Sequence, residues 1–110
     1  MVDNKVVIPK SIIILGRKYK IIETNDSIDG DKSKNLVWGR IYFKEKIIKI
    51  YNNGDPYDVW DSIIHEIMHA VDYHIGSNIS HGVITGISSI LSHILIDNDI
   101  INKEWRKHVK

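Results

Sequence analysis

The first part of the chain carries short apolar runs with the length and spacing of strands. Two of these runs, at residues 12–15 and 19–23, are separated by Gly16-Arg17. A two-residue turn at this pair would join the runs into a β-hairpin. A shorter apolar run at residues 6–8 adds another candidate strand. The pattern therefore predicts that the fold begins with β structure.

A polar segment then interrupts this pattern, and further apolar runs that predict strands follow it. Residues 25–35 are mostly polar and predict a loop. Two more strands are expected at residues 36–43 and 46–51, with Lys44-Glu45 as the tight, charged turn between them. In the second of these strands, isoleucines alternate with other residues, which is the period of a half-buried strand. We therefore expect a small sheet of three or four strands.

The next segment has the start, the end and the periodicity of a long helix. Asp55 suits the N-cap position, Pro56 suits the first helical position, and Gly76 is a residue that ends helices. The predicted helix runs from residue 56 to about residue 75. Its apolar residues recur at the spacing of one helical face. They are Val59, Ile63, Ile64, Ile67 and Val71.

A second helix is predicted after Ser80, a candidate N-cap, and it extends to about residue 97. Residues 99–110 are predicted to form a polar tail or a short helix. Trp105 is the one large residue of this segment that would anchor it to the rest of the fold. The core stripe expected for the second helix consists of Ile84, Ile87, Leu91 and Ile94.

Strands followed by helices predict an α+β fold, in which the helices cover one face of a small antiparallel sheet. The chain of 110 residues has the size of one domain, so we expect residues 1–110 to form a single unit. Hydrophobic residues make up 43% of the chain and charged residues 26%, and both fractions are ordinary for a folded protein.

Composition excludes several classes of protein. The longest apolar run, at residues 12–15, is far shorter than the roughly 20 residues that cross a bilayer, so no membrane association is expected. The net charge of +1 is too small for a dedicated nucleic-acid binder. No secretory signal is evident, and we expect a cytoplasmic protein. The chain has no cysteine, so a metal ion would have to be held by histidines and carboxylates.

All six histidines lie at position 65 or beyond, and the sequence at 65–69 is His-Glu-Ile-Met-His. Residues four apart share one face of a helix, so His65 and His69 can bind the same Zn²⁺ ion. Glu66 lies about 100° around the helix, outside the ligand set but within reach of a metal-bound water. There it can act as the general base of hydrolysis. The motif therefore predicts a zinc-dependent hydrolase.

The segment from His65 to Asp72 resembles the active-site helix of gluzincin-type metallopeptidases, in particular the minimal and phage-encoded ones. The resemblance extends upstream to the predicted hairpin and strands. It implies a zincin-like fold, hydrolysis of a peptide or protein substrate, and a phage-type origin. It also implies that residues 47–51 or 38–43 form the strand that faces the substrate.

A catalytic zinc ion in a hydrolase takes three protein ligands and a water molecule. The resemblance implies a Glu on the second helix, but alignment at residues 78–80 puts Thr85 at that position. His81 lies one turn before Thr85 on the same predicted face, and we take it as the third ligand, with a site of two histidines and water as the alternative. His93 lies about two turns further along and is less suited. Asp72 is expected to orient one of the histidines.

Two other functions remain open on the sequence alone. The missing Glu is compatible with a degenerate zincin-fold protein that acts as a binding or inhibitory module. A purely structural zinc ion could instead stabilise a chain of this size that has no disulfides. A structural site is closed by a fourth protein ligand, whereas a catalytic site keeps one position open. The number of ligands around His65 and His69 therefore separates a structural metal from a catalytic one.

Overall fold

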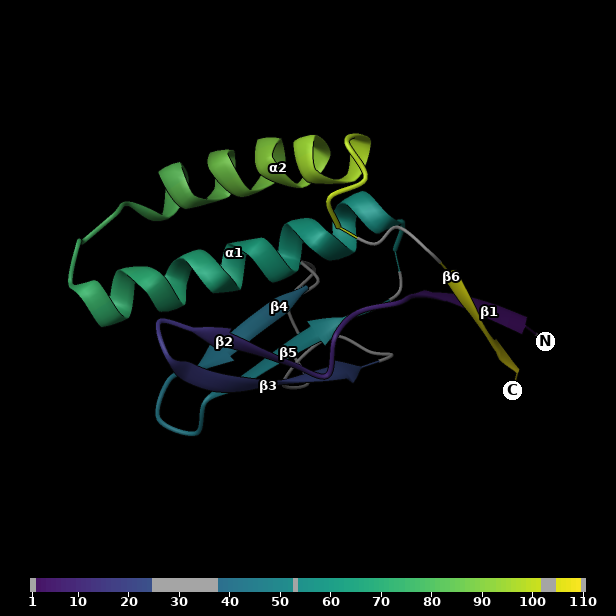
Figure 1. Cartoon of the computed structure of the whole chain (residues 1–110), viewed down its shortest axis with the longest axis horizontal. Helices are drawn as coiled ribbons and strands as arrows, with labels where there is room; N and C mark the ends of the chain where they lie inside the picture. Colours follow the sequence, from purple (N-terminus) through teal and green to yellow (C-terminus); the bar gives the residue numbers. More distant parts are fainter. Residues whose placement is uncertain (1, 25–37, 53, 102–104, 110) are drawn as a thin grey trace, which may run out of the picture.

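The computed structural model describes residues 2–24, 38–52, 54–101 and 105–109. Its main part is a four-stranded sheet with two helices over one face, and a two-stranded ribbon lies to one side (Figure 1). The sheet consists of β2 (Ser11–Ile14), β3 (Arg17–Thr24), β4 (Gly39–Tyr42) and β5 (Ile47–Tyr51). The helices are α1 (Pro56–Ile75) and α2 (His81–Asp97), and the ribbon consists of β1 (Val2–Val6) and β6 (Trp105–Val109).

The predicted α+β class is confirmed, but the sheet is mixed rather than purely antiparallel. The strands lie in the order β2-β3-β5-β4, and β3 pairs with β5 in the parallel direction. After β3 the chain continues to β4 at the far edge of the sheet, and β5 then returns between β4 and β3. A parallel pair needs a long connection, which residues 25–46 supply. The polar segment 25–35, predicted to be a loop, lies outside the described residues.

The predicted hairpin forms, with its turn one residue earlier than expected. β2 and β3 pair antiparallel with Ile14 opposite Arg17, so that Leu15 and Gly16 are the two turn residues. Both residues have positive φ angles, 50° and 79° respectively. Positive φ at both central residues is the mark of a type I′ turn, which matches the twist of paired strands.

The core lies between the inner face of the sheet and one face of α1. Buried residues alternate with more exposed ones along β3 and β5, as the period of a strand requires. α2 packs on the other side of α1, so the order of layers is sheet, α1, α2 (Figure 1). Neither described helix is long and apolar enough to cross a membrane. The largest fully buried core residues include Tyr19, Ile48, Ile50, Val59 and Ile63.

Both helices begin and end where the sequence predicts. The Asp55 side chain accepts a hydrogen bond from the backbone N–H of Asp58 at 3.0 Å, and Gly76 ends α1 with a φ of 64°. The Ser80 side chain accepts a hydrogen bond from the N–H of Val83 at 3.2 Å and caps α2. These local interactions satisfy backbone groups that a helix end leaves unpaired.

The core stripe predicted for α2 is partly wrong. Ile84 is buried, but Ile87 and Ile94 are 45% and 49% exposed. The helix buries Ser88 and Ser92 instead, and their hydroxyl groups donate to carbonyl oxygens of the same helix. Burial therefore leaves neither hydroxyl unpaired. Small side chains let α2 lie closer to α1 than a row of isoleucines would.

The C-terminal tail also differs from its prediction as a polar segment or short helix. Residues 105–109 form the strand β6, which pairs antiparallel with β1 so that Val6 lies opposite Trp105. This pairing joins the two ends of the chain, and a local sequence pattern cannot reveal a partner so far away.

Asn52 connects the end of β1 to the main sheet. Its side chain is almost fully buried. Its Oδ1 accepts a hydrogen bond from the N–H of Val6 at 3.1 Å, and its Nδ2 donates to the carbonyl oxygen of Val6 at 2.8 Å. Nδ2 also lies 2.6 Å from Oε1 of Glu23. One side chain thus pairs both backbone groups of a buried residue.

We expect the substitution Asn52→Ala to lower the free energy of unfolding by about 2–4 kcal/mol, because it leaves two buried backbone groups of Val6 without their partner. Urea denaturation followed by circular dichroism measures the change. Ser89→Ala, on the exposed side of α2, serves as the control and should change stability by less than about 0.5 kcal/mol. Equal stability of the two variants would contradict the role of Asn52.

Candidate metal centre

Helix α1 carries His65 and His69 one turn apart on the same face. Their Nε2 atoms lie 3.0 Å from each other. Both side chains are half-buried, so the surrounding helix surface limits the directions in which the rings can point. The two imidazoles therefore converge on one point, as the four-residue spacing predicts.

His81, the first residue of α2, completes this group. Its ring centroid lies 4.9 Å from that of His65 and 5.1 Å from that of His69. The ligand nitrogens of the three side chains all lie within 4.8 Å of one another. The three histidines predicted as metal ligands thus come together. Within the described part of the chain, no fourth His, Asp or Glu joins the group.

The loop between the helices brings His81 to this position. Gly76 and Asn78 adopt left-handed backbone conformations, with φ angles of 64° and 59°. Asp72, which the sequence suggested as a partner for a histidine, accepts hydrogen bonds from the Ser77 hydroxyl at 2.6 Å and from the Ile79 N–H at 2.8 Å. Its carboxylate therefore holds the loop, and it contributes to the centre by positioning α2.

The electrostatics of the three-histidine group favour a bound metal ion. Burial lowers the pKa of His65, and the neighbouring His69 and His81 lower it further. Burial and His81 likewise lower the pKa of His69. Both rings are therefore neutral at neutral pH, which is the form that binds metals. In a tetrahedral site, nitrogens at about 2.0–2.1 Å from one metal ion lie about 3.4 Å apart, and rotations of the rings would adjust the three nitrogens to this spacing.

Glu66 lies beside this group but faces strand β4. Its side chain is 6% exposed, and burial raises its pKa to about 7, with Arg40 acting in the opposite direction. Gly39 of β4 leaves space for the carboxylate, because a Cβ atom at this position would lie 3.0 Å from Oε2 of Glu66. A carboxyl group that titrates near neutrality can both accept and donate a proton.

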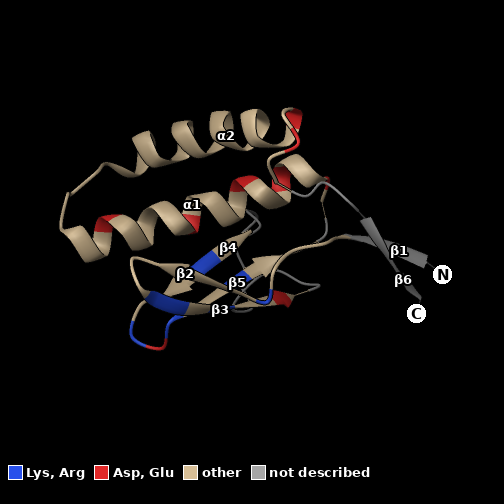
Figure 2. Cartoon of the chain, viewed as in Figure 1, with Lys and Arg blue, Asp and Glu red and all other residues tan. Residues whose placement is uncertain are grey.

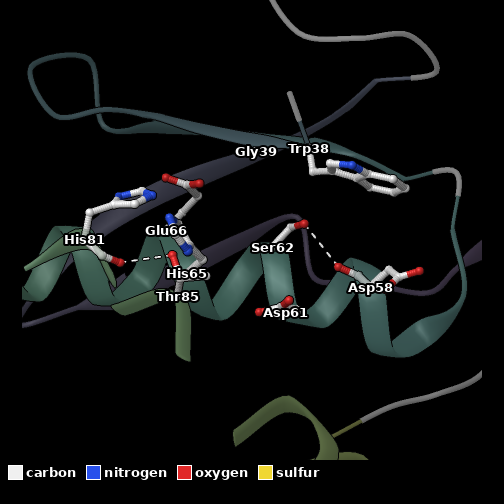
Figure 3. A pocket seen from close by; sticks show the side chains of 9 residues that line it. All are labelled: Trp38, Gly39, Asp58, Asp61, Ser62, His65, Glu66, His81 and Thr85. Atoms are coloured by element: carbon white, nitrogen blue, oxygen red, sulfur yellow. Dashed lines mark hydrogen bonds between the residues drawn. The ribbon is translucent and has the colours of Figure 1, made fainter. Parts of the chain in front are cut away.

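A hollow of about 490 Å³ is lined by residues of α1, of α2 and of the β4 segment. Figure 3 shows that Glu66, His65 and His81 cluster at one end of it, whereas Trp38 lies over the first turns of α1 at the other end. The protein thus has room for a ligand in front of the histidines and the carboxyl group. The lining residues are Trp38, Gly39, Asp58, Asp61, Ser62, His65, Glu66, His81 and Thr85.

Sequence reasoning did not identify Gly39, Asp58 and Asp61 as part of this hollow. Asp58 lies two turns and Asp61 one turn before His65 on the same side of α1, and this spacing could have indicated them. Burial and the neighbouring carboxylates of Asp55 and Asp61 raise the pKa of Asp58. Gly39 gives no comparable signal, because its role depends on how β4 packs against α1.

His74 of α1 and His93 of α2, the second of which the sequence made less suited as a ligand, have other contacts. The Tyr19 hydroxyl is hydrogen-bonded to Nε2 of His74 at 2.5 Å, and His93 stacks on the ring of Tyr57. Thr85, which stands where the resemblance implies a Glu, lines the hollow. Its hydroxyl donates to the carbonyl oxygen of His81 at 3.0 Å and so supports the first turn of α2.

Comparisons with protein-family models, with curated proteins and with solved structures find no match to this chain. The centre is therefore defined by its own geometry. It consists of three converging imidazoles, a buried carboxyl group beside them, and a hollow in front of both.

We expect His81→Ala to weaken the binding of Zn²⁺ by about 100-fold or more, because even the loss of an indirect partner of a ligand costs 10–100-fold in affinity. Isothermal titration calorimetry with a competing chelator measures the affinity. His93→Ala removes a histidine of the same helix that lies outside the group, and it should leave the affinity unchanged. Equal affinities of the two variants would remove His81 from the centre.

Burial of Glu66 predicts a pH dependence of stability in the metal-free protein. Because the pKa of about 7 in the folded state exceeds the ordinary value of 4.5, folding favours the protonated form. The wild-type protein should therefore lose stability relative to Glu66→Gln as the pH rises from about 4.5 to 7, by an amount on the order of 3 kcal/mol. Urea denaturation of both proteins in EDTA at pH 5 and pH 8 checks this. Parallel pH profiles would contradict it.

Proposed function

We propose that the chain is a zinc-dependent metallopeptidase, with His65, His69 and His81 as the metal ligands and Glu66 as the general base. The observation that carries the proposal is the open three-histidine group with a buried carboxyl group of near-neutral pKa beside it. A set of imidazole ligands without thiolates suits Zn²⁺. When bound, zinc supplies a Lewis acid that polarises a carbonyl group and makes a water molecule more acidic.

The role of Glu66 follows from its surroundings. It accepts a proton from the attacking water molecule and then donates this proton to the amine that leaves. In the metal-free chain, burial raises the pKa of Glu66 to about 7, and the positive charge of a bound ion would favour the carboxylate that accepts the proton. The absence of a side chain at Gly39 leaves room for the carboxylate between α1 and β4.

We further propose that an extended peptide substrate lies along β4. The strand β5, the other strand that the resemblance implies, pairs with β3 on one side and with β4 on the other, so it cannot accept a further strand. In contrast, β4 is at the edge of the described sheet, and Gly39 borders the hollow. An edge strand can bind an extended peptide through backbone hydrogen bonds.

The number of ligands favours a catalytic metal over a purely structural one. A structural zinc site is closed by four protein ligands, whereas a catalytic site keeps one position for water or substrate. The group contains three histidines, and no further ligand of the described residues joins them. His81 is exposed, and together with His65 and Glu66 it borders the hollow. A substrate can therefore reach the position that a fourth ligand would otherwise close.

Replacement of Glu66 by Gln tests the proposed mechanism. We expect Glu66→Gln to bind Zn²⁺ with the affinity of the wild-type protein but to lose hydrolysis by about 10²–10⁴-fold, because the amide cannot accept the proton. The assay measures cleavage of a mixed library of fluorescence-quenched peptides by the zinc-loaded proteins. EDTA should abolish the activity of the wild-type protein, and added Zn²⁺ should restore it.

Glu45→Gln provides a matched control, because Glu45 is an exposed glutamate in the turn between β4 and β5. This variant should keep full activity. Retention of activity by Glu66→Gln would contradict the role of Glu66. Absence of cleavage by the zinc-loaded wild-type protein would contradict the proposed function and favour the binding module.

A further inference from the structure

Helix α2 has two sides with different surroundings. In Figure 1 it lies on the side of α1 away from the sheet, as the outermost layer. Its buried side, which lies toward α1, carries Ile84, Ser88, Ser92 and Ile96. The fully buried residues of α2 are therefore two isoleucines and two serines, and four of its large apolar side chains remain exposed.

The outward side of α2 carries a row of four apolar side chains, which we call the outer stripe. It consists of Val83, Ile87, Ile90 and Ile94, which are 50%, 45%, 65% and 49% exposed. Their spacing of four, three and four residues is that of the a and d positions of a coiled-coil seam. A helix that is apolar on both sides is normally buried on both sides. The outer stripe thus has the pattern of a helix–helix contact but lacks a partner within the described chain.

The charge pattern around the outer stripe indicates whether a protein or a membrane surface binds there. Residues 73–96 contain no Asp, Glu, Lys or Arg, and Figure 2 shows α2 without charged residues until its C-terminal end. Two copies of the stripe can therefore approach each other without like-charge repulsion. Residues 50–102 also contain no Lys or Arg. A helix that binds an anionic membrane surface carries such residues, so the pattern favours a protein partner.

We propose that the outer stripe binds the outer stripe of a second copy of this chain, with the two α2 helices antiparallel. The spacing of four, three and four is symmetric about its midpoint. An antiparallel copy therefore places Val83 opposite Ile94 and Ile87 opposite Ile90, and every side chain of the stripe gains an apolar partner. A contact of this kind uses the same surface on both copies and closes as a dimer.

The surroundings of the stripe permit close contact. Gly86 flanks it, and a Cβ atom at Gly86 would meet no other atom within 4 Å, so the backbone of a second helix can approach there. The helix has 17 residues and is therefore about 25 Å long. A contact between two such helices buries roughly 1,000 Å² in total, near the lower limit of specific interfaces. We expect a dimer with a dissociation constant in the micromolar range.

The dimer contact leaves the candidate metal centre accessible. His81 lies on the side of α2 that faces His65 and His69 of α1, roughly 160° around the helix from Val83. The outer stripe and the metal ligands are thus on opposite sides of the same helix. The proposal is independent of whether the chain is a peptidase.

Sedimentation velocity of the full chain between about 1 and 300 micromolar tests the proposal, because this range brackets a micromolar dissociation constant. We expect the wild-type protein to change from monomer to dimer across the range. Ile90→Glu should remain monomeric throughout, because it buries a charge at the centre of the contact. Ile13→Glu is the control, because Ile13 is 70% exposed on β2 and lies outside the stripe.

A pair of substitutions tests the antiparallel arrangement. Ile87→Lys alone should be monomeric, like Ile90→Glu, whereas the double variant I87K/I90E in one chain should dimerise. In the antiparallel dimer the two new charges of opposite sign face each other across the contact. A parallel dimer would place each charge opposite its own copy, so a monomeric double variant would overturn the antiparallel arrangement.

Two other outcomes would overturn the proposal as a whole. One is a wild-type protein that stays monomeric at every concentration. If this monomer binds vesicles of uncharged lipid and Ile90→Glu does not, the stripe binds a membrane surface instead. The second is a dimer that Ile90→Glu leaves unchanged, because the contact would then lie elsewhere. Circular dichroism and zinc affinity of each variant confirm that the fold is retained.

Discussion

Helix α1 packs against two neighbours at once, because it lies between the sheet and α2. Its residues divide around the helix according to the layer that they meet. Val59 and Ile63 pack into the core with the sheet, and Glu66 lies against β4. His65 and His69 meet the start of α2. The core contacts, Glu66 and two of the three clustered histidines are therefore positioned by a single helix, so any rotation of α1 would move all of them together.

The features that the sequence predicted correctly are those determined by neighbouring residues. Asp55 and Gly76 mark the ends of α1 because a cap needs only a side chain or a left-handed residue next to the helix end. His65 and His69 converge because four residues make about one turn. His81 was predicted from its place at the start of a second helix, and its approach to α1 depends on the loop that Asp72 holds.

The features that the sequence did not predict depend on residues far apart in the chain. The parallel pairing of β3 with β5 is decided by where the chain re-enters the sheet after residue 24. In α2, the predicted apolar stripe placed Ile87 in the core, whereas the contact with α1 buries the smaller Ser88 instead. The space that Gly39 leaves for the Glu66 carboxylate appears only when β4 and α1 are brought together. Local patterns contain no information of this kind.

The ligands of the candidate metal centre come from two helices, which gives the centre a mechanical consequence. His65 and His69 keep their spacing as long as α1 is helical, but the third nitrogen is present only while α2 is docked. An ion that binds all three side chains would therefore act as a crosslink between two layers. By thermodynamic linkage, the ion would stabilise the docked arrangement of α2. The stabilisation would equal the difference between the free energies with which the ion binds three and two imidazoles. The fraction of the protein that binds metal would then depend on the equilibrium between docked and undocked α2.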